Sequence, residues 1–271
     1  MIDSTTAGIL ADVAAATAAP CVRLDASRAT EPAGPLASKL GGVFYFPPGL
    51  TWPLDAQSRP LWPLAQLNFA DLPGLDGFPR AGILQFFIAG DDLYGMDLDD
   101  LGRQAGFRVI YHPQVGESTV PNPPQVDVVD ESMLPFTGEF SLVARPDTMS
   151  MTPSDWRFEA AFSEASRRQP GHTASPGTLE LNDVHNAMIE ADEKGIFGNR
   201  IGGYPAFTQN DPRLWDRSLQ GHTALLLQLD SSLDPTGEIM WGDMGVACFL
   251  IEPERLSRCD FSNVLYTWDC S

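Results

Sequence analysis

The sequence has few basic residues for its size and no long apolar run, and both absences exclude classes of protein. Lysine and arginine together number 17 against 36 acidic residues, which gives a formal net charge of −19. A field of that sign repels nucleic-acid backbones and anionic membrane surfaces, so we expect neither as a partner. Nothing in the chain approaches the ~20 consecutive apolar residues that a membrane-spanning helix requires. The charge permits a basic protein or a cationic ligand as partner, although solubility alone also explains it.

Cysteine is scarce, and its spacing carries no motif. The four cysteines are Cys21, Cys248, Cys259 and Cys270. They form no CxxC pair and have no histidine at the spacing of a metal ligand, so we expect no metal site and no cofactor. Reduced thiols in a cytoplasmic protein fit this pattern. Cys248 lies in the apolar run GVACFLI, where a small buried side chain is expected.

The first twenty residues are rich in alanine but lack the features of a signal peptide. Asp3 and Asp12 interrupt the apolar stretch, and no lysine or arginine precedes Arg23. A signal peptide begins with positive charge and continues with an unbroken apolar segment. We therefore expect a short helix that begins at Ser4 or Thr5 and carries apolar residues on one face. Those residues are Ile9, Leu10 and Val13.

Glycine and proline are abundant, with 24 of the first and 23 of the second. Both interrupt regular structure, so many short strands joined by turns are favoured over long helices. LAQLNF and LLLQLD are apolar runs broken by one glutamine, a pattern typical of strands buried on both faces. The same test predicts strands at GILQFFI, GVACFLI, FRVIYH (107–112), VDVVD (126–130) and EFSLVAR (139–145).

Two stretches far apart in the chain read alike, namely ASKLGGVFYFPPGLTWP (37–53) and FGNRIGGYPAFTQNDPR (197–213). Their double glycines are about 161 positions apart, and Gln66 and Gln228 match at nearly the same offset. AGILQFFI and MGVACFLI then follow in the same order. Three ordered landmarks indicate an internal duplication. We predict a single domain over 1–271, with repeated units at about 21–112 and 196–271 and a helical and loop connection over 113–195.

The connection begins with the proline-rich segment PQVGESTVPNPP and contains two predicted helices. TPSDWRFEAAFSEAS has Thr152 or Ser154 as its N-cap, with Trp156, Ala160 and Phe162 on its apolar side. TLELNDVHNAMIEADEKG places Leu181, Val184, Met188 and Ile189 on one stripe and ends at Gly195. RRQPGHTASPG between them is predicted to be an exposed loop. We expect both helices to pack against the sheets.

The double glycines and the acidic segment 90–102 each have a chemical interpretation and a structural one. The double glycines supply positive φ angles or close backbone approach at a strand turn. A phosphate-binding role lacks its usual context, because neither site has GxGxxG or GxxxxGK[ST] spacing. GDDLYGMDLDDLG (90–102) holds five aspartates but fails the EF-hand spacing, so a solvated connection after a strand is favoured over a Ca²⁺ site.

The motifs LGG…WP…LAQLNFADLP…GILQFF and GNRIGGYPAFTQNDPR…LLLQLDS…MWGDMGVACFLI make the sequence similar to the YwqG-like family, a bacterial domain family of unknown function. The resemblance extends from about Val22 to the closing DFSNVLYTWDCS and includes SKLGG and GFRVIY. It implies a mainly β (α+β) fold, an antiparallel β roll with a few peripheral helices. The first copy, GGVFYFPPG, departs from the family's Gly-Gly-x-Pro form, whereas GGYPAF keeps it. The resemblance implies no activity.

The candidate ligand-binding residues are polar side chains in apolar strands or close to the second double glycine. Gln66 and Gln228 occupy matching positions, and an unpaired buried amide costs about 1–3 kcal/mol. Each glutamine therefore either contacts a ligand in a shared cleft or bonds neighbouring backbone and stabilises a turn. The other candidates are Arg108, Gln209, Asp211, Arg213, Trp241 and Asp243. Asp211 and Arg213 alternatively pair with each other across Pro212.

Two functional hypotheses follow from these residues. The leading one is a non-catalytic binding module that recognises a protein, or a small ligand, at the cleft between the units and neutralises a basic partner. The alternative is a hydrolase with an Asp-based or Cys/His-based site formed between the units. No GxSxG motif is present, and the histidines are scattered;. These histidines are His112, His172, His185 and His222.

Overall fold

The computed structural model describes residues 4–116, 131–168, 196–234 and 237–271, with single positions at 184, 186 and 188. The helices are α1 (Ser4–Thr17), α2 (Phe158–Arg168) and α4 (Pro253–Ser257), with short 3₁₀ turns η1 (Glu131–Met133), η2 (Pro212–Leu214) and η3 (Arg217–Gly221). The strands are β1 (Ala19–Arg28), β2 (Lys39–Gly41), β3 (Trp62–Asn68), β4 (Ile83–Ile88), β5 (Phe107–His112), β6 (Glu139–Met149), β7 (Arg200–Gly202), β8 (Ala224–Asp230), β9 (Ser232–Asp234), β10 (Gly237–Ile239), β11 (Val246–Ile251) and β12 (Val264–Asp269). Within the described residues no helix combines the length and apolar content needed to cross a membrane.

Ten of the strands form one antiparallel sheet, and the predicted mainly β class is confirmed. The order is β12-β11-β8-β7-β1-β6-β2-β3-β4-β5, while β9 and β10 form a separate hairpin. The runs LAQLNF, LLLQLD, GILQFFI, GVACFLI, FRVIYH and EFSLVAR all lie on strands, as predicted. VDVVD lies outside the described residues.

The sheet order is symmetric about its centre. From β1 outward the neighbours are β7, β8, β11 and β12; from β6 outward they are β2, β3, β4 and β5. β1 pairs with β6 along its whole length, from Ala19 opposite Met149 to Arg28 opposite Phe140. β1 also pairs with β7, and β6 with β2, so each long central strand joins the arm formed by the other half of the chain.

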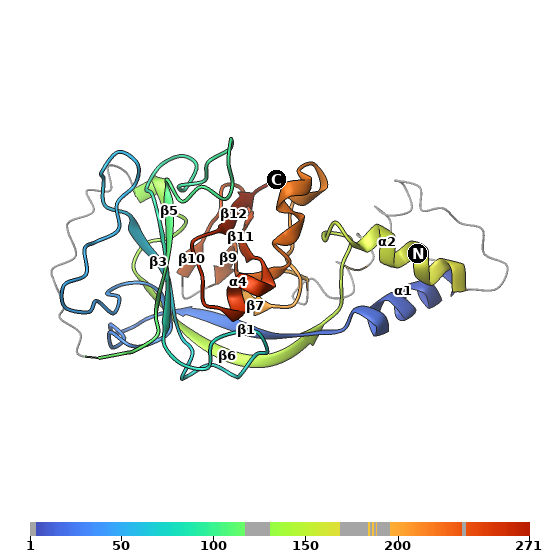
Figure 1. The fold of residues 1–271 in the computed structure, drawn as a ribbon, viewed down its shortest axis with the longest axis horizontal. Coiled ribbons are helices and arrows are strands. Elements are labelled where there is room, and N and C mark those ends of the chain that lie inside the picture. Colours follow the sequence, from blue (N-terminus) through green and yellow to red (C-terminus); the bar gives the residue numbers. More distant parts are fainter. Residues whose placement is uncertain are drawn as a thin grey trace.

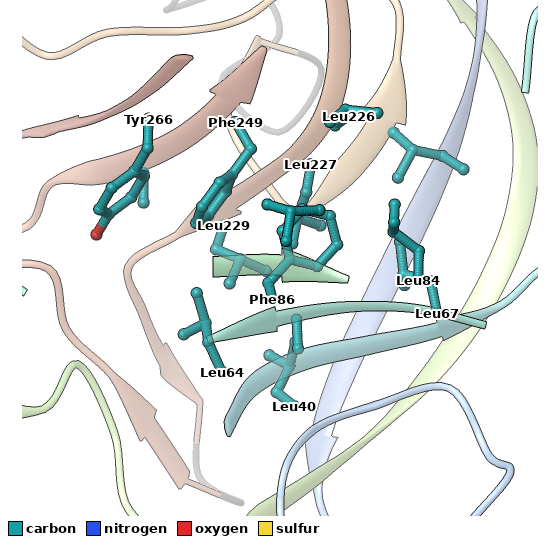
Figure 2. Packing of buried hydrophobic residues seen from close by; sticks show 14 of the residues in the cluster. Leu40, Leu64, Leu67, Leu84, Phe86, Leu226, Leu227, Leu229, Phe249 and Tyr266 are labelled. Carbon is teal, nitrogen blue, oxygen red and sulfur yellow. The ribbon is translucent and has the colours of Figure 1, made fainter. Parts of the chain in front are cut away.

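The two arms of the sheet face each other across the main hydrophobic core (Figure 1). Leu40, Leu64 and Phe86 from one arm meet residues of β8, β11 and β12 from the other (Figure 2). The ring centroids of Phe86 and Phe249 lie 4.9 Å apart, and Phe249 stacks on Tyr266 at 4.4 Å. This burial of large side chains from both arms holds the halves together as one body.

The double glycines adopt the left-handed conformation predicted for them. Gly41 and Gly42 have φ of 63° and 70°, and Gly202 and Gly203 have φ of 70° and 66°. A Cβ at Gly42 would lie 1.8 Å from Oε2 of Glu139, so close approach also requires glycine there;. The sequence motif therefore marks a turn at the end of β2 and of β7.

The basic residue before each double glycine is buried. Lys39 donates to the backbone carbonyl oxygens of Ala33 and Gly34 at 3.2 and 3.1 Å, and its Nζ lies 3.7 Å from Oε2 of Glu139. Arg200 donates to the carbonyl oxygens of Ile196 and Phe197. Burial lowers the pKa of Lys39 and lowers that of Arg200 to about 10;. Both cations fix the loop that precedes the turn.

The connection contains the strand predicted at EFSLVAR, which is β6 and occupies the centre of the sheet, and one helix start in it needs correction. Helix α2 begins at Phe158, later than the predicted caps Thr152 and Ser154, because residues 152–157 form turns closed by the backbone bonds from Asp155 N–H to Thr152 and from Phe158 N–H to Asp155.

The helices also do not pack against the sheet as expected. α1 and α2 pack on each other beyond the ends of β1 and β6 (Figure 1). Their own small core contains Ile9 and Val13, as predicted, with Phe158, Phe162 and Val184. Of the second predicted helix, only positions 184, 186 and 188 are described, and Leu181, Ile189, Gly195 and most of RRQPGHTASPG lie outside the described residues.

Candidate functional site

Gln66 is fully buried, and its amide is used by the loop that follows the first double glycine. Its Oε1 accepts from the backbone N–H of Tyr45 at 2.7 Å, and its Nε2 donates to the carbonyl oxygens of Pro35 and Ala37 at 2.8 and 2.9 Å. Gln85 on β4 extends the network, because its Nε2 donates to Gln66 Oε1 and to the Tyr45 carbonyl. The amide of Gln66 therefore has no free bonding capacity for a ligand.

Gln228 makes the equivalent bonds in the other arm. Its Oε1 accepts from the N–H of Ala206 at 2.8 Å, and its Nε2 donates to the carbonyl of Gly198 at 2.9 Å. Cys248 takes the place of Gln85, with its Sγ 3.5 Å from the Ala206 carbonyl oxygen. Four strands separate β3 from β8 in the sheet, and each glutamine bonds its own loop, so the structure does not bring the two together in one cleft.

Further hydrogen bonds recur at the offset of the predicted repeat. Trp52 Nε1 donates to the Leu61 carbonyl at 2.9 Å, and Arg213 Nη1 donates to the His222 carbonyl at the same distance. The other matched pairs are Asn68 N–H to Ser38 Oγ with Asp230 N–H to Asn199 Oδ1, and Gln57 N–H to Asp55 Oδ1 with Ser218 N–H to Asp216 Oδ1. This correspondence supports the duplication, which remains a prediction.

Asp211 and Arg213 pair with each other, which confirms the alternative given for them. Arg213 is fully buried, and its Nη2 lies 2.7 Å from Asp211 Oδ2 and 3.3 Å from Asp155 Oδ2. Arg157 binds Asp155 at 2.7 Å and stacks over the Tyr204 ring. Burial by itself raises the pKa of Asp155, but the hydrogen bond from Arg157 and the charge of Arg213 outweigh it and hold that pKa below its ordinary value;.

Gln209 and Asp243 lie at the C-terminal end of β12, and Trp241 belongs to the main hydrophobic core. Gln209 Nε2 donates to the Cys270 carbonyl at 2.7 Å, and the carbonyl of Asp243 accepts from the Ser271 N–H. Trp241 is fully buried against Tyr94. Asp269, a residue that the sequence did not single out, accepts from the backbone of Thr208 and Gln209. Burial nevertheless raises the pKa of Asp269.

Arg108 lines a different site, a cleft of about 700 Å³ between the two halves. We name it the edge cleft; its lining residues are Gln104, Arg108, Val109, Ile110, Tyr111, Pro113, Cys259, Phe261 and Ser262. The first six belong to β5 and its flanks, and the last three to the α4–β12 connection. Across the cleft the rings of Tyr111 and Phe261 lie 5.4 Å apart, and Gln104 Nε2 donates to the Phe261 carbonyl at 2.8 Å.

The guanidinium of Arg108 is a cation of this cleft that the described residues leave unpaired. Among the described residues it makes no hydrogen bond, ion pair or ring contact, whereas Arg255 nearby is bound to Glu252 and Asp260. A partly buried cation without a carboxylate partner is poised to receive an anionic group. Of the predicted site residues, Arg108 alone lines this cleft.

A second cleft of about 690 Å³ lies beside β1 and also joins the two halves. It is lined by Arg23–Ala26 of β1 and by residues of the β7 and β8 arm, including Asn199 and Asp230. Its charged groups are engaged, since Arg23 binds Asp147 and Asp25 binds Arg145 at 3.0 Å. Asp230 accepts from Gly198 N–H, so we rank this cleft below the edge cleft as a binding site.

The acidic loop forms turns. Asp91 accepts from the N–H groups of Leu93 and Gly95, and Asp97 from those of Asp99 and Asp100. In the part of the chain that is described, no group of three or more His, Cys, Asp or Glu side chains could hold a metal ion. These aspartates therefore cap turns in the connection between β4 and β5.

Two histidines and all four cysteines are described, and no hydrogen bond joins one kind to the other. His112 Nε2 lies 3.0 Å from Gln85 Oε1, burial lowers its pKa, and His222 Nδ1 lies 3.2 Å from the Leu219 carbonyl. Burial raises the pKa of the Cys248 thiol well above its ordinary value. His172 and His185 lie outside the described residues. The described part of the chain thus brings no Cys/His pair together for nucleophilic chemistry.

The comparison with known families agrees with the extent of the sheet. A family model described as a domain of unknown function, DUF1963, matches residues 38–270. The search of curated proteins gives no significant match. The matched region starts just before β2 and takes in both edge strands, although it leaves out β1. Because this match covers most of the chain, the protein belongs to the DUF1963 family.

Proposed function

We propose that the protein is a non-catalytic binding module and that a partner protein docks at the edge cleft. The observation that carries the proposal is Arg108, which has no partner among the described residues and lines a cleft of about 700 Å³ where the two halves meet. Binding sites are typically concave and combine apolar walls with a few polar groups that are not already satisfied. Tyr111, Phe261 and Val109 supply such walls.

The partner that we propose is a basic protein, which the module neutralises. The net charge of −19 supports this choice, because a field of that strength speeds the association of a cationic partner;. Asp99 and Asp100 are exposed on the loop that leads to Gln104, a residue of the cleft wall. They would meet the basic surface of the partner around the contact made by Arg108.

A pull-down from the native host followed by mass spectrometry tests this function. We expect one stoichiometric basic protein, with an association rate constant that falls steeply between low and physiological ionic strength. The matched comparison uses a variant in which Asp99 and Asp100 are both asparagine. These substitutions should slow association of the partner more than they speed its dissociation. Recovery of no partner, together with turnover of a generic substrate panel, would overturn the proposal.

A hydrolase is the second candidate, and Asp269 is the observation that favours it. Its pKa is raised by burial, and carboxyls of this kind act as general acids in hydrolases;. Gln209 lies beside it through the bond from its N–H to Asp269 Oδ2. If this candidate is correct, hydrolysis of a panel of ester, phosphoester and glycoside substrates should be lost in Asp269→Asn and retained in Asp243→Asn.

Two finer assignments accompany the function as proposals. Within the DUF1963 family we place the chain with the YwqG-like proteins on the motifs around its double glycines. We also propose that the two arms arose by duplication, which is supported by the hydrogen bonds that recur at a nearly constant offset. A cytoplasmic location is part of the same proposal.

A further inference from the structure

Strand β5 ends the sheet, and its outer edge faces the edge cleft. In an antiparallel sheet the N–H and C=O groups of alternate residues point to the same neighbour. Ala89 N–H donates to the Gly106 carbonyl, so the even-numbered residues of β5 bond β4 and the odd-numbered ones point outward. Val109 N–H accordingly bonds Gln104 Oε1 at 3.0 Å, on the cleft side.

Within the described part of the chain, part of this outer edge is unused. No hydrogen bond from the described residues reaches the Val109 carbonyl or the backbone N–H and C=O of Tyr111. The opposite edge strand is treated differently, because Tyr266 N–H on β12 donates to the Leu101 carbonyl. The β4–β5 connection thus contacts β12 and one end of β5, and no described residue pairs with the Tyr111 end.

We infer that the edge cleft binds an extended peptide segment, which adds to β5 as a further strand. The inference rests on the proposed binding function and names how the partner is held. Main-chain groups on a free edge strand select an extended backbone, because one residue opposite Tyr111 can exchange both hydrogen bonds with it. Gln104 at one end and Pro113, which has no N–H, at the other limit the added strand to a few residues.

Arg108 determines which side chain the segment carries. Successive residues of a strand point to opposite faces, so Arg108 lies on the opposite face from Val109 and Tyr111, which pack toward the core;. A cross-strand neighbour on the face of Arg108 lies within reach of its guanidinium. A carboxylate there forms a charge-assisted hydrogen bond, so the segment carries Asp or Glu at this position, or ends there with its own carboxylate.

Selection from a random dodecapeptide library on the intact protein tests the inference. We expect enriched peptides with an acidic residue, and slower hydrogen–deuterium exchange of the Tyr111 amide when they bind. Arg108→Gln should weaken binding about tenfold, the loss expected for a hydrogen bond to a charged group. Arg217→Gln, an equal change of charge at an exposed arginine in η3, should leave the dissociation constant unchanged.

Two modified peptides separate the backbone contribution from the side-chain contribution. Methylation of the amide opposite Tyr111 should abolish binding, and Glu→Gln in the peptide should lose affinity for the parent protein but not for Arg108→Gln. A peptide with a free C-terminus and no acidic side chain distinguishes the terminal carboxylate from Asp or Glu. Thermal unfolding of both arginine variants should match the parent, because neither arginine has a bonding partner among the described residues.

The inference is overturned if no peptide is enriched, or if enriched peptides bind without protecting Tyr111 and ignore Arg108→Gln. These outcomes are distinct from failure of the proposed function. A basic partner that is recovered in the pull-down, while neither that partner nor any peptide slows exchange of the Tyr111 amide, keeps the binding function and removes the strand-addition mode. Enriched peptides that protect Tyr111, without any recovered partner protein, keep the strand-addition mode and remove the proposed function.

Discussion

In the first arm of the sheet, Gln66 and Gln85 hold the loop after the double glycine; in the second arm, Gln228 and Cys248 hold it. The backbone groups that are bonded correspond, although one of the two side chains differs in kind. Trp52 and Arg213 extend the comparison, because an indole and a guanidinium donate to equivalent carbonyls. The comparison shows that the loop keeps its geometry although the side chain that donates a hydrogen bond to it differs. The two shared glutamines therefore serve to hold this loop in place.

The largest expected effect is at Arg213, where the two arms differ most in chemistry. Arg213→Met leaves Asp211 and Asp155 buried with less compensation, so the free energy of unfolding should fall by about 3–5 kcal/mol in urea denaturation. Trp52→Phe removes one neutral hydrogen bond and part of a ring that packs on Phe46 and Phe87, and should cost less, nearer ~1 kcal/mol;. Arg217→Met on the surface should change stability by less than ~0.5 kcal/mol. Equal losses in the free energy of unfolding at Arg213 and Trp52 would contradict the difference between the two arms.

The glutamines should show a smaller difference of the same kind. Gln66→Leu and Gln228→Leu each leave a buried N–H unpaired, at Tyr45 and Ala206, which costs about 1–3 kcal/mol. Gln66 donates to one more carbonyl, and its Oε1 accepts from the Gln85 amide where that of Gln228 accepts from the weaker thiol donor of Cys248, so replacement of Gln66 should cost more;. The midpoint of chemical denaturation measures both. A greater loss at Gln228 would contradict the contacts described above.

Alanine in the second glycine of each pair tests the turns. Gly42→Ala and Gly203→Ala both place a side chain at positive φ, which costs about 1–2 kcal/mol;. At Gly42 the new Cβ also displaces Glu139, the carboxylate that faces buried Lys39, whereas at Gly203 it meets the flexible side chain of Met149. We expect the melting temperature to fall further for Gly42→Ala, and an equal fall would dispute the role of Glu139.

Acid should weaken the second arm through Asp155. Its pKa is lower in the folded protein than its ordinary value, so its contribution is present above about pH 4 and is lost as the pH falls through the folded pKa;. Circular dichroism at pH 7 and at successively lower pH should show the parent losing stability over this range, with a shallower dependence in Asp155→Asn. An identical dependence in both proteins would exclude Asp155 as the responsible group.

The strands were predictable because each has a local signature, whereas the contacts between segments were not. Apolar runs broken by one glutamine identified β3 and β8, and the double glycines identified their positive φ angles. The destination of Gln66 and Gln228 could not be read in the same way, because a buried amide in a strand gives no indication of whether its partner is a loop or a ligand. The start of α2 was misplaced because Asp155 closes a turn that resembles an N-cap in sequence.

The candidate site was only partly predictable. Arg108 was selected from the sequence, but Tyr111, Gln104 and Phe261 were not, since they meet only when the α4–β12 connection crosses the end of β5. Asp155 and Asp269 were also missed, because their properties arise from burial and from partners distant in the chain. The sequence contained a signal for Lys39 and Arg200, since a basic residue precedes each double glycine. It did not indicate that these two side chains are buried.

The exchange of the central strands has a consequence for synthesis on the ribosome. When β2 to β5 have emerged, β2 still lacks one neighbour, because that neighbour is β6, which follows after residue 138. β1 in turn must await both β6 and β7. The nascent chain therefore keeps an incomplete sheet until the second half is made, and closure of the sheet is a late, cooperative step that favours chaperone assistance.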